Sequence, residues 1–152
     1  MGLLGWLVLL RCANALALRT GFAPDEFWQS LEVAHGLAFG YGHRTWEWQA
    51  GLRSWLHPLL FAAPYATLRA LGLDAPWAVL VAPKLLQGAL AALGDLCLLR
   101  LAERHLGRGA GRWALACHLC SWFSLFCCPR SLANCLEATL SLAALVLWPL
   151  PE

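Results

Sequence analysis

The chain has 152 residues, of which 60% are hydrophobic and 13% are charged, and its mean hydropathy is +0.58. Soluble domains are about 45–50% apolar and about 25% charged, so this composition excludes an ordinary soluble domain and indicates lipid as the surrounding solvent. The net charge is only +2, which gives no general attraction to nucleic acid.

Residues 3–20 form the first apolar run, which we interpret as a retained membrane helix. A secretory signal has a basic start and an unbroken apolar stretch, whereas this run lacks the former and is interrupted by Arg11. Arg11 and Asn14 are costly in lipid unless they face a protein interior or an aqueous cavity. The alternative for Arg11 is that its long side chain reaches the lipid headgroups.

A second helix, lying in the membrane interface, is predicted at residues 24–39. Pro24 suits the first helical position, and Asp25 and Glu26 complement the helix dipole in the first turn. An apolar side and a polar side alternate at helical spacing, as expected of an interfacial helix. The apolar side contains Phe27, Leu31, Ala34 and Ala38, and the polar side contains Asp25, Gln29 and Glu32.

Residues 40–53 are polar, glycine-bearing and aromatic, so we predict a loop at the water boundary. Residues 55–73 are apolar but barely long enough to cross a hydrocarbon core of about 30 Å. The positive-inside rule favours an interfacial or re-entrant helix over a membrane-spanning helix here, because it keeps the next arginine-rich loop in the cytoplasm. That loop is flanked by Arg100, Arg104, Arg108 and Arg112.

Three further membrane helices are predicted, at residues 76–101, 112–128 and 131–148. The expected fold is therefore an all-α, polytopic membrane helical bundle. Three to five helices are few for such a bundle, so we expect the chain to be part of a longer protein. The polar residues within these runs should face the bundle; they are Lys84, Gln87, Asp95 and Glu137. A small-solute transporter is an alternative, suggested by the charged residues Arg11, Lys84, Asp95 and Glu137.

The seven cysteines lie mostly inside apolar runs, where they act as small hydrophobic side chains. Cys117 and Cys120 have the spacing of a metal-binding pair, but no second pair stands at zinc-site spacing. We expect no metal there. For His57 and His118 we expect structural roles in which the ring nitrogens are hydrogen-bonded.

Asp25 and Glu26 are adjacent carboxylates at the exit of a membrane helix. A carboxylate in this position can accept a proton from a hydroxyl group, or it can simply compensate the helix dipole. Trp46, Glu47 and Trp48 can stack on and hydrogen-bond a sugar, or form an interfacial aromatic belt.

Four stretches resemble, in order, motifs of the dolichyl-phosphate-mannose-dependent α-mannosyltransferases, which are GT-C-type enzymes of glycosyltransferase family 22. The ordered set is more specific than any single motif, and the resemblance covers roughly residues 5–148. It is strongest to members that assemble glycosylphosphatidylinositol (GPI) anchors. The stretches are residues 24–33, 41–48, 52–54 and 129–134, the last with Ser131 where threonine is usual and Ala133 before Asn134.

The resemblance implies a multi-pass endoplasmic reticulum membrane enzyme whose first lumenal loop contains the interfacial helix and the catalytic carboxylate. Asp25 would be the general base, assisted by Glu26, for inverting transfer of the third, α1,2-linked mannose from dolichyl-phosphate-mannose to the GPI precursor. Arg53 and Arg130 would stabilise the departing phosphate. The alternative for Arg130 is that it anchors a helix end in the lipid headgroups. The remaining substrate-binding residues would be Gln29, Trp46, Glu47, Trp48 and Asn134.

The donor and the GPI precursor are the expected partners, together with membrane lipids. We expect no cofactor besides the lipid-linked donor, and the residues leave a requirement for a divalent metal open. A noncatalytic membrane fragment of such an enzyme is the alternative function.

Overall fold

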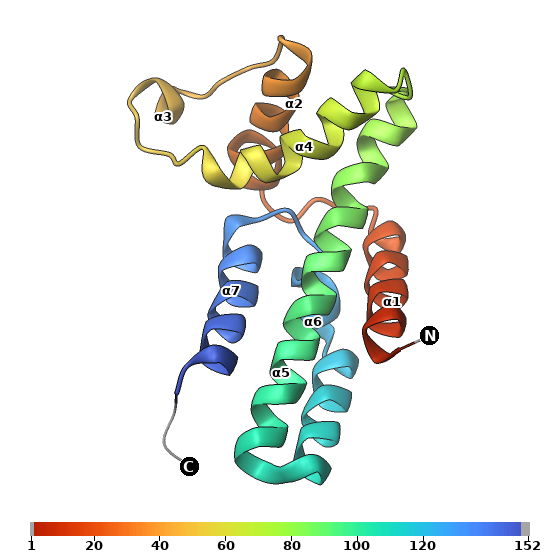
Figure 1. Ribbon diagram of the computed structural model, residues 1–152. Coiled ribbons are helices and arrows are strands. Elements are labelled where there is room, and N and C mark those ends of the chain that lie inside the picture. The colour runs from red at the N-terminus through yellow and green to blue at the C-terminus, as the bar shows by residue number, and fades with distance from the viewer. Residues whose placement is uncertain (1, 150–152) are drawn as a thin grey trace. The chain divides into compact units, whose positions relative to one another are not determined.

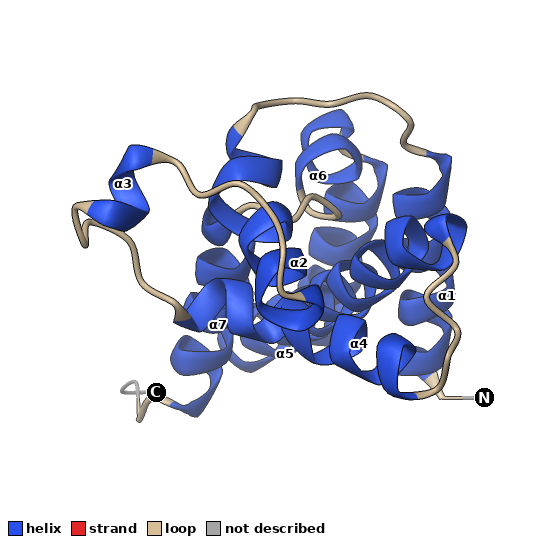
Figure 2. Ribbon diagram, turned by 90° about the horizontal axis from the view of Figure 1, so that it is seen from above, coloured by secondary structure: helices blue, strands red, loops and turns tan. Residues whose placement is uncertain are grey.

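The computed structural model describes residues 2–149, which form helices and loops without a strand (Figures 1 and 2). The all-helical prediction is therefore confirmed for this part of the chain. The helices are α1 (Leu3–Ala17), the π-helix η1 (Phe27–Leu31), α2 (Glu32–Phe39), α3 (Trp46–Gln49), α4 (Leu56–Ala70), α5 (Pro76–Cys120), α6 (Trp122–Cys127) and α7 (Ala133–Leu147).

The helices belong to two compact units. Unit 1 comprises Met1–Leu18, Gln87–Arg130 and Asn134–Glu152, and unit 2 comprises Arg19–Leu86 and Ser131–Ala133.

Helix α5 turns back on itself at Gly107, whose φ of 86° and ψ of 164° are open only to glycine. The two arms, residues 76–106 and 108–120, run antiparallel in Figure 1. Their alignment is fixed by His118, whose Nε2 lies 3.1 Å from Oδ1 of Asp95. The loop expected between residues 101 and 112 is thus a tight turn, and the returning helix is interrupted at Ser121 before α6 begins.

A fully buried ion pair joins α1 to α5 within unit 1. Arg11 and Asp95 have exposed fractions of 0% and 1%, and two nitrogens of the guanidinium donate to the two carboxylate oxygens at 2.7 Å each. Arg11 also donates to the carbonyl oxygen of Ser124 at 3.1 Å. His118 contacts Asp95 and, through Nδ1, the hydroxyl of Ser124 at 3.0 Å. Arg11 therefore faces the protein interior, and the headgroup alternative is wrong.

The other polar residues of the apolar runs differ from one another. Gln87 is buried and donates to the carbonyl oxygen of Cys128 at 3.0 Å, as expected of a residue that faces the bundle. Glu137, by contrast, is exposed on the surface of this chain. Thr139 is the buried residue of α7, and two residues along a helix correspond to about 200°, which turns Glu137 to the opposite face.

Unit 2 is built on the packing of α2 and η1 against α4. Its core contains Ala34 and Phe61, both 0% exposed, and Tyr65 at 3%. The helix predicted at 24–39 contains a π-turn, in which the N–H of Glu32 bonds to the carbonyl oxygen of Phe27 five residues back. The wider turn shifts the phase of the helix, so Phe27 is 49% exposed instead of sharing the buried side.

Helix α4 lies inside the predicted segment 55–73 but is shorter. Its 15 residues span about 22 Å, less than a hydrocarbon core of about 30 Å. Near its start, burial lowers the pKa of His57, and Nε2 of this ring has no hydrogen-bond partner among residues 2–149. The prediction of a satisfied structural role is therefore wrong for Nε2, although the ring contacts Phe61 edge-on, at 5.2 Å between ring centroids.

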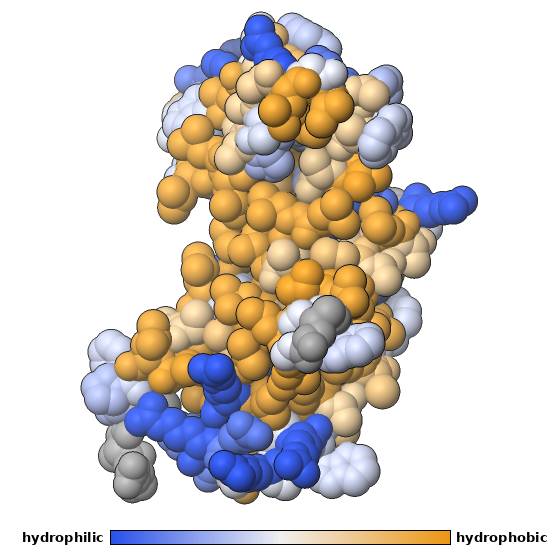
Figure 3. Space-filling model, turned by 45° about the vertical axis from the view of Figure 1, so that its right-hand side comes forward, coloured by the Kyte–Doolittle hydropathy of each residue, from blue (hydrophilic) through white to orange (hydrophobic). Residues whose placement is uncertain are grey.

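Within residues 2–149, α5 alone is long and apolar enough to cross a membrane, while α1 and α7 are apolar but have 15 residues each. Figure 3 shows hydrophobic side chains along the flank of unit 1 and hydrophilic ones gathered where α5 turns back. The four arginines of the turn are exposed; they are Arg100, Arg104, Arg108 and Arg112.

The ion pair predicts a large effect of a small substitution. Asp95→Asn leaves the guanidinium of Arg11 buried without a counter-charge, and we expect the free energy of unfolding to fall by about 3–5 kcal/mol. Thermal unfolding of the purified chain in detergent measures this. The double variant Arg11→Met/Asp95→Leu should recover most of the loss, and Arg19→Met, at an exposed position, serves as the control. Equal stability of Asp95→Asn and wild type would contradict the role of the pair.

Candidate active site

Asp25 and Glu26 are neighbours in sequence but have different surroundings. Glu26 is 7% exposed, and its Oε1 accepts hydrogen bonds from the backbone N–H groups of Phe22 at 3.1 Å and Ala23 at 3.4 Å. Its carbonyl oxygen accepts a bond from the hydroxyl of Ser131 at 3.4 Å. Asp25, in contrast, is exposed. Glu26 therefore fixes the chain at the start of the helix, and Asp25 is the carboxylate that a substrate can reach.

A salt bridge in the following loop lies within electrostatic reach of Asp25. Nε and Nη2 of Arg53 donate to the two carboxylate oxygens of Glu47, each at 3.0 Å. The hydrogen bond to Glu47 raises the pKa of Arg53, and the charge of Asp25 adds to this effect. The same hydrogen bond lowers the pKa of Glu47. Two carboxylates and one guanidinium thus form a charged, solvent-accessible group in unit 2.

The two tryptophans of α3 have separate roles. Trp48 is 7% exposed, its Nε1 donates to the carbonyl oxygen of Trp28 at 3.2 Å, and its ring centroid lies 4.8 Å from that of Trp55. Trp46 is 68% exposed and so can offer its face to a sugar. Trp48 positions the loop beside the first helical turn of unit 2, where Gln29 is half-buried.

Arg130 and Asn134 belong to unit 1, whereas the carboxylates belong to unit 2. Arg130 is 4% exposed, and its Nε donates to the carbonyl oxygen of Phe126 at 3.0 Å. Its guanidinium also lies over the Phe126 ring, 4.2 Å from the centroid. Asn134 is exposed near the start of α7.

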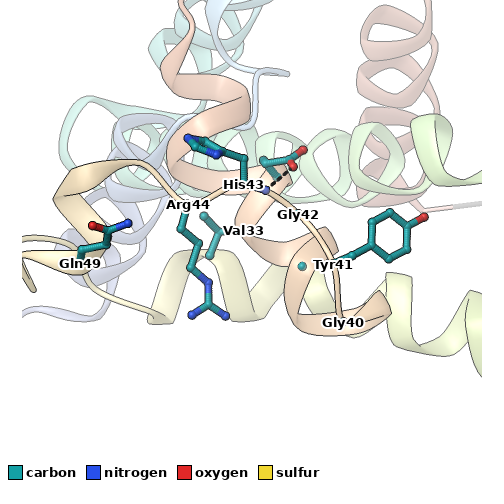
Figure 4. A pocket seen from close by; sticks show the side chains of 9 residues that line it. Val33, Gly40, Tyr41, Gly42, His43, Arg44 and Gln49 are labelled. Carbon is teal, nitrogen blue, oxygen red and sulfur yellow. Dashed lines mark hydrogen bonds between the residues drawn. The ribbon is translucent and has the colours of Figure 1, made fainter.

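The sequence did not single out a pocket of about 340 Å³ in unit 2, between α2 and the loop that follows it (Figure 4). Its polar lining comes from Glu32, His43, Arg44 and Gln49. The sequence signals around it are the glycines at positions 36, 40 and 42 and the stretch 41–48, whose first four residues line the pocket. Among residues 2–149, no group of three or more histidine, cysteine, aspartate or glutamate side chains is placed to hold a metal ion.

The sequence motifs indicate a membrane-associated glycosyltransferase. The apolar helices and the exposed carboxylate of Asp25 agree with this class of protein. Residues 3–151 match the model of the Alg9-like mannosyltransferase family, and the chain belongs to this family.

Relatives extend the match along nearly the whole chain. It is 48% identical over 139 residues to Mannosyltransferase APTG1 of Arabidopsis thaliana, covering 91% of this chain and 25% of the relative. It is 43% identical over 148 residues to GPI alpha-1,2-mannosyltransferase 3 of Homo sapiens, covering 97% of this chain and 27% of the relative. It is 47% identical over 138 residues to GPI mannosyltransferase 3 of Yarrowia lipolytica, covering 91% of this chain and 27% of the relative.

The family predicted from the motifs is confirmed. The chain spans about a quarter of the length of these relatives. No solved structure matches it.

The different surroundings of the two carboxylates predict different effects on stability. Glu26→Ala removes the acceptor of two backbone N–H groups at a helix start, which should lower the free energy of unfolding by about 1–2 kcal/mol. Asp25→Ala, one residue away, should change it by less than about 0.5 kcal/mol. Thermal unfolding of both variants compares them, and a larger loss for Asp25→Ala would contradict the assignment.

Proposed function

We propose that this chain supplies the catalytic base of an α-1,2-mannosyltransferase that adds the third mannose of the GPI precursor in the endoplasmic reticulum lumen. The donor is dolichyl-phosphate-mannose. The observation that supports the proposal is the exposed carboxylate of Asp25 near the Arg53–Glu47 salt bridge, with Glu26 engaged by the backbone. Family membership and the names of the relatives supply the reaction class.

In the proposed reaction, Asp25 accepts the proton of the 2-hydroxyl group on the acceptor mannose. The hydroxyl oxygen forms a bond to C1 of the donor mannose while the bond from C1 to the phosphate oxygen breaks, and dolichyl phosphate leaves with that electron pair. Attack opposite the leaving group converts a β-linked donor into an α-linked product. A cation near the phosphate stabilises its charge in the transition state, and Arg53 is the basic side chain beside Asp25.

Other residues assist in binding. Trp46 offers an exposed aromatic face to a sugar ring, and Glu47 holds Arg53 in a fixed position. Arg130 and Asn134 contribute to the phosphate and sugar contacts of the complete bundle. Gln29 and Trp48 shape the first lumenal loop around Asp25.

The proposed topology has α1, the two arms of α5 and α7 within the membrane as parts of a multi-pass bundle. The segment from η1 to α4 lies at the lumenal interface, and the turn at Gly107 lies in the cytoplasm. This arrangement is supported by the short length of α4 and by the exposed arginines on both sides of the turn.

The transporter alternative is less well supported than the transferase. Arg11 and Asp95, two of the residues that suggested a polar path, are buried and bond to each other. An assay of the 152-residue chain alone in liposomes, for mannose transfer from dolichyl-phosphate-mannose, distinguishes the enzyme from the noncatalytic fragment. Transfer supports the enzyme, and no transfer by the wild-type chain supports the fragment.

The direct test of function uses a chimera in which this chain replaces the matching quarter of the human relative. Expressed in cells that lack that enzyme, the wild-type chimera should restore GPI-anchored proteins at the surface, as measured by flow cytometry. Asp25→Asn should lower mannose transfer in isolated membranes by about 10²–10⁴-fold, since it removes the base. Restoration by Asp25→Asn as complete as by wild type would refute the assignment, provided that both chimeras are expressed equally.

Topology has an independent test. A single glycosylation acceptor sequence inserted at Gly109 should stay unmodified, because the arginine-flanked turn is cytoplasmic. An acceptor sequence inserted at Gly51, in the loop of unit 2, should be glycosylated in the lumen. Modification at Gly109 would mean that residues 55–73 cross the membrane.

A further inference from the structure

We propose that the pocket between α2 and residues 40–44 binds one sugar ring of the acceptor glycan, next to the ring that reacts at Asp25. This inference rests on the proposed function for the identity of the ligand. Neither the sequence motifs nor the names of the relatives assign a role to the pocket.

Glycines make the pocket possible. The chain leaves α2 through Gly40, whose φ of 86° is left-handed, and Gly42 follows with a φ of 153°. A Cβ atom on Gly42 would lie 3.2 Å from Oε1 of Glu32 and 3.4 Å from Cα of Gly36, so a side chain there would push the loop off the helix. The close approach is held by a hydrogen bond of 2.9 Å from the N–H of His43 to Oε1 of Glu32, drawn in Figure 4.

The groups in the pocket suit a neutral, hydroxyl-rich ligand. Oε2 of Glu32 has no hydrogen-bond partner among residues 2–149 and can accept bonds from hydroxyl groups. Arg44 and Gln49 supply donors, and Gln49 also supplies an acceptor. In Figure 4, Arg44 extends from the loop that leads to α3, and Gln49 extends from α3 itself.

The same groups disfavour charged ligands. The carboxylate of Glu32 repels a phosphate group and so opposes the attraction of Arg44 for it. One carboxylate is too few for a calcium ion, which takes six to eight oxygen ligands. The volume of about 340 Å³ is near the lower end of the range for ligand pockets, about 300–1,000 Å³, so it suits a single ring and not a whole glycan.

The pocket is linked to the candidate base through aromatic contacts in unit 2. The His43 ring meets the Trp28 ring edge-on, with 5.7 Å between centroids, and Trp28 lies three residues after Asp25. The carbonyl oxygen of Trp28 in turn accepts the indole N–H of Trp48, at 3.2 Å. A sugar in the pocket therefore lies against the framework that positions Asp25.

The test is a titration of the purified chain in detergent with methyl α-D-mannopyranoside, followed by saturation-transfer NMR. Glu32→Gln keeps an oxygen for the His43 N–H but replaces the acceptor Oε2 by a donor, and it should raise the Kd about tenfold. Gln49→Ala should also raise the Kd severalfold. The side chain of Gln49 has no hydrogen-bond partner among residues 2–149, so this variant should fold normally. Asp74→Asn removes an equal charge at an exposed site outside the pocket and should leave the Kd within about twofold.

The outcomes separate this inference from the proposed function. Loss of mannose transfer in the Asp25→Asn chimera with unchanged binding of the mannoside by the Asp25→Asn chain supports both. Wild-type binding by both Glu32→Gln and Gln49→Ala, or no binding by the wild-type chain, overturns the pocket and leaves the role of Asp25 standing. Mannoside binding that depends on Glu32, together with full transfer by Asp25→Asn, overturns the base and leaves the pocket standing.

Discussion

The proposed site depends on how one carboxylate holds the backbone at the start of a helix. Oε1 of Glu26 accepts two N–H groups of the segment that follows α1, which fixes the first turn of unit 2 and buries this side chain. The side chain one residue earlier leaves the helix about 100° away, so Asp25 stays exposed. The same anchoring keeps Asp25 within reach of the charge of Arg53. An acidic pair is thereby divided into a buried residue that anchors the backbone and an exposed residue, which is the proposed base.

The charged residues within the apolar runs of unit 1 differ from those of the candidate site in unit 2. In unit 1, Arg11 and Asp95 are buried and bond to each other, to Ser124 and to His118, which leaves them little capacity for chemistry. In unit 2, Asp25, Glu47 and Arg53 are accessible to solvent, whereas Glu26 is buried and bonds to the backbone. Buried charges are affordable only when paired, whereas a general base must reach its substrate, so this difference favours unit 2 as the place of reaction.

Much of the fold was predictable because apolar runs and breaks are local features of the sequence. Helices α1, α2, α4, α5 and α7, the turn in the arginine-rich segment and the carboxylate motif follow from such features. The short helix α3 lies in a stretch that was expected to be a loop, and the interruption at Ser121 was not predicted. The partner of Arg11 was not predictable, because Asp95 is 84 residues away and many polar residues could have met it. The phase shift at Phe27 was not predicted either, since a π-turn depends on packing more than on residue preference.

The candidate site was predictable in its residue types and only partly in their roles. The motifs named Asp25 with Glu26, Trp46 with Trp48, and Arg53 with Glu47. Burial in the structure then distinguished the two carboxylates and the two tryptophans, and the structure added the salt bridge between Arg53 and Glu47. The pocket beside α2 was not predictable, because it arises from a loop that folds back on the helix and not from a residue pattern.

The most direct measurement first removes the carboxylate of Asp25 by substitution and then restores a carboxylate there by chemical modification. Asp25→Cys in the chimera should abolish mannose transfer, and treatment of the membranes with iodoacetate, which attaches a carboxymethyl group, should restore it at least about tenfold. Iodoacetamide attaches a neutral group of similar size and should restore nothing, while the wild-type chimera controls for reaction at other cysteines. Equal recovery with both reagents, or full transfer by untreated Asp25→Cys, would contradict a carboxylate base at this position.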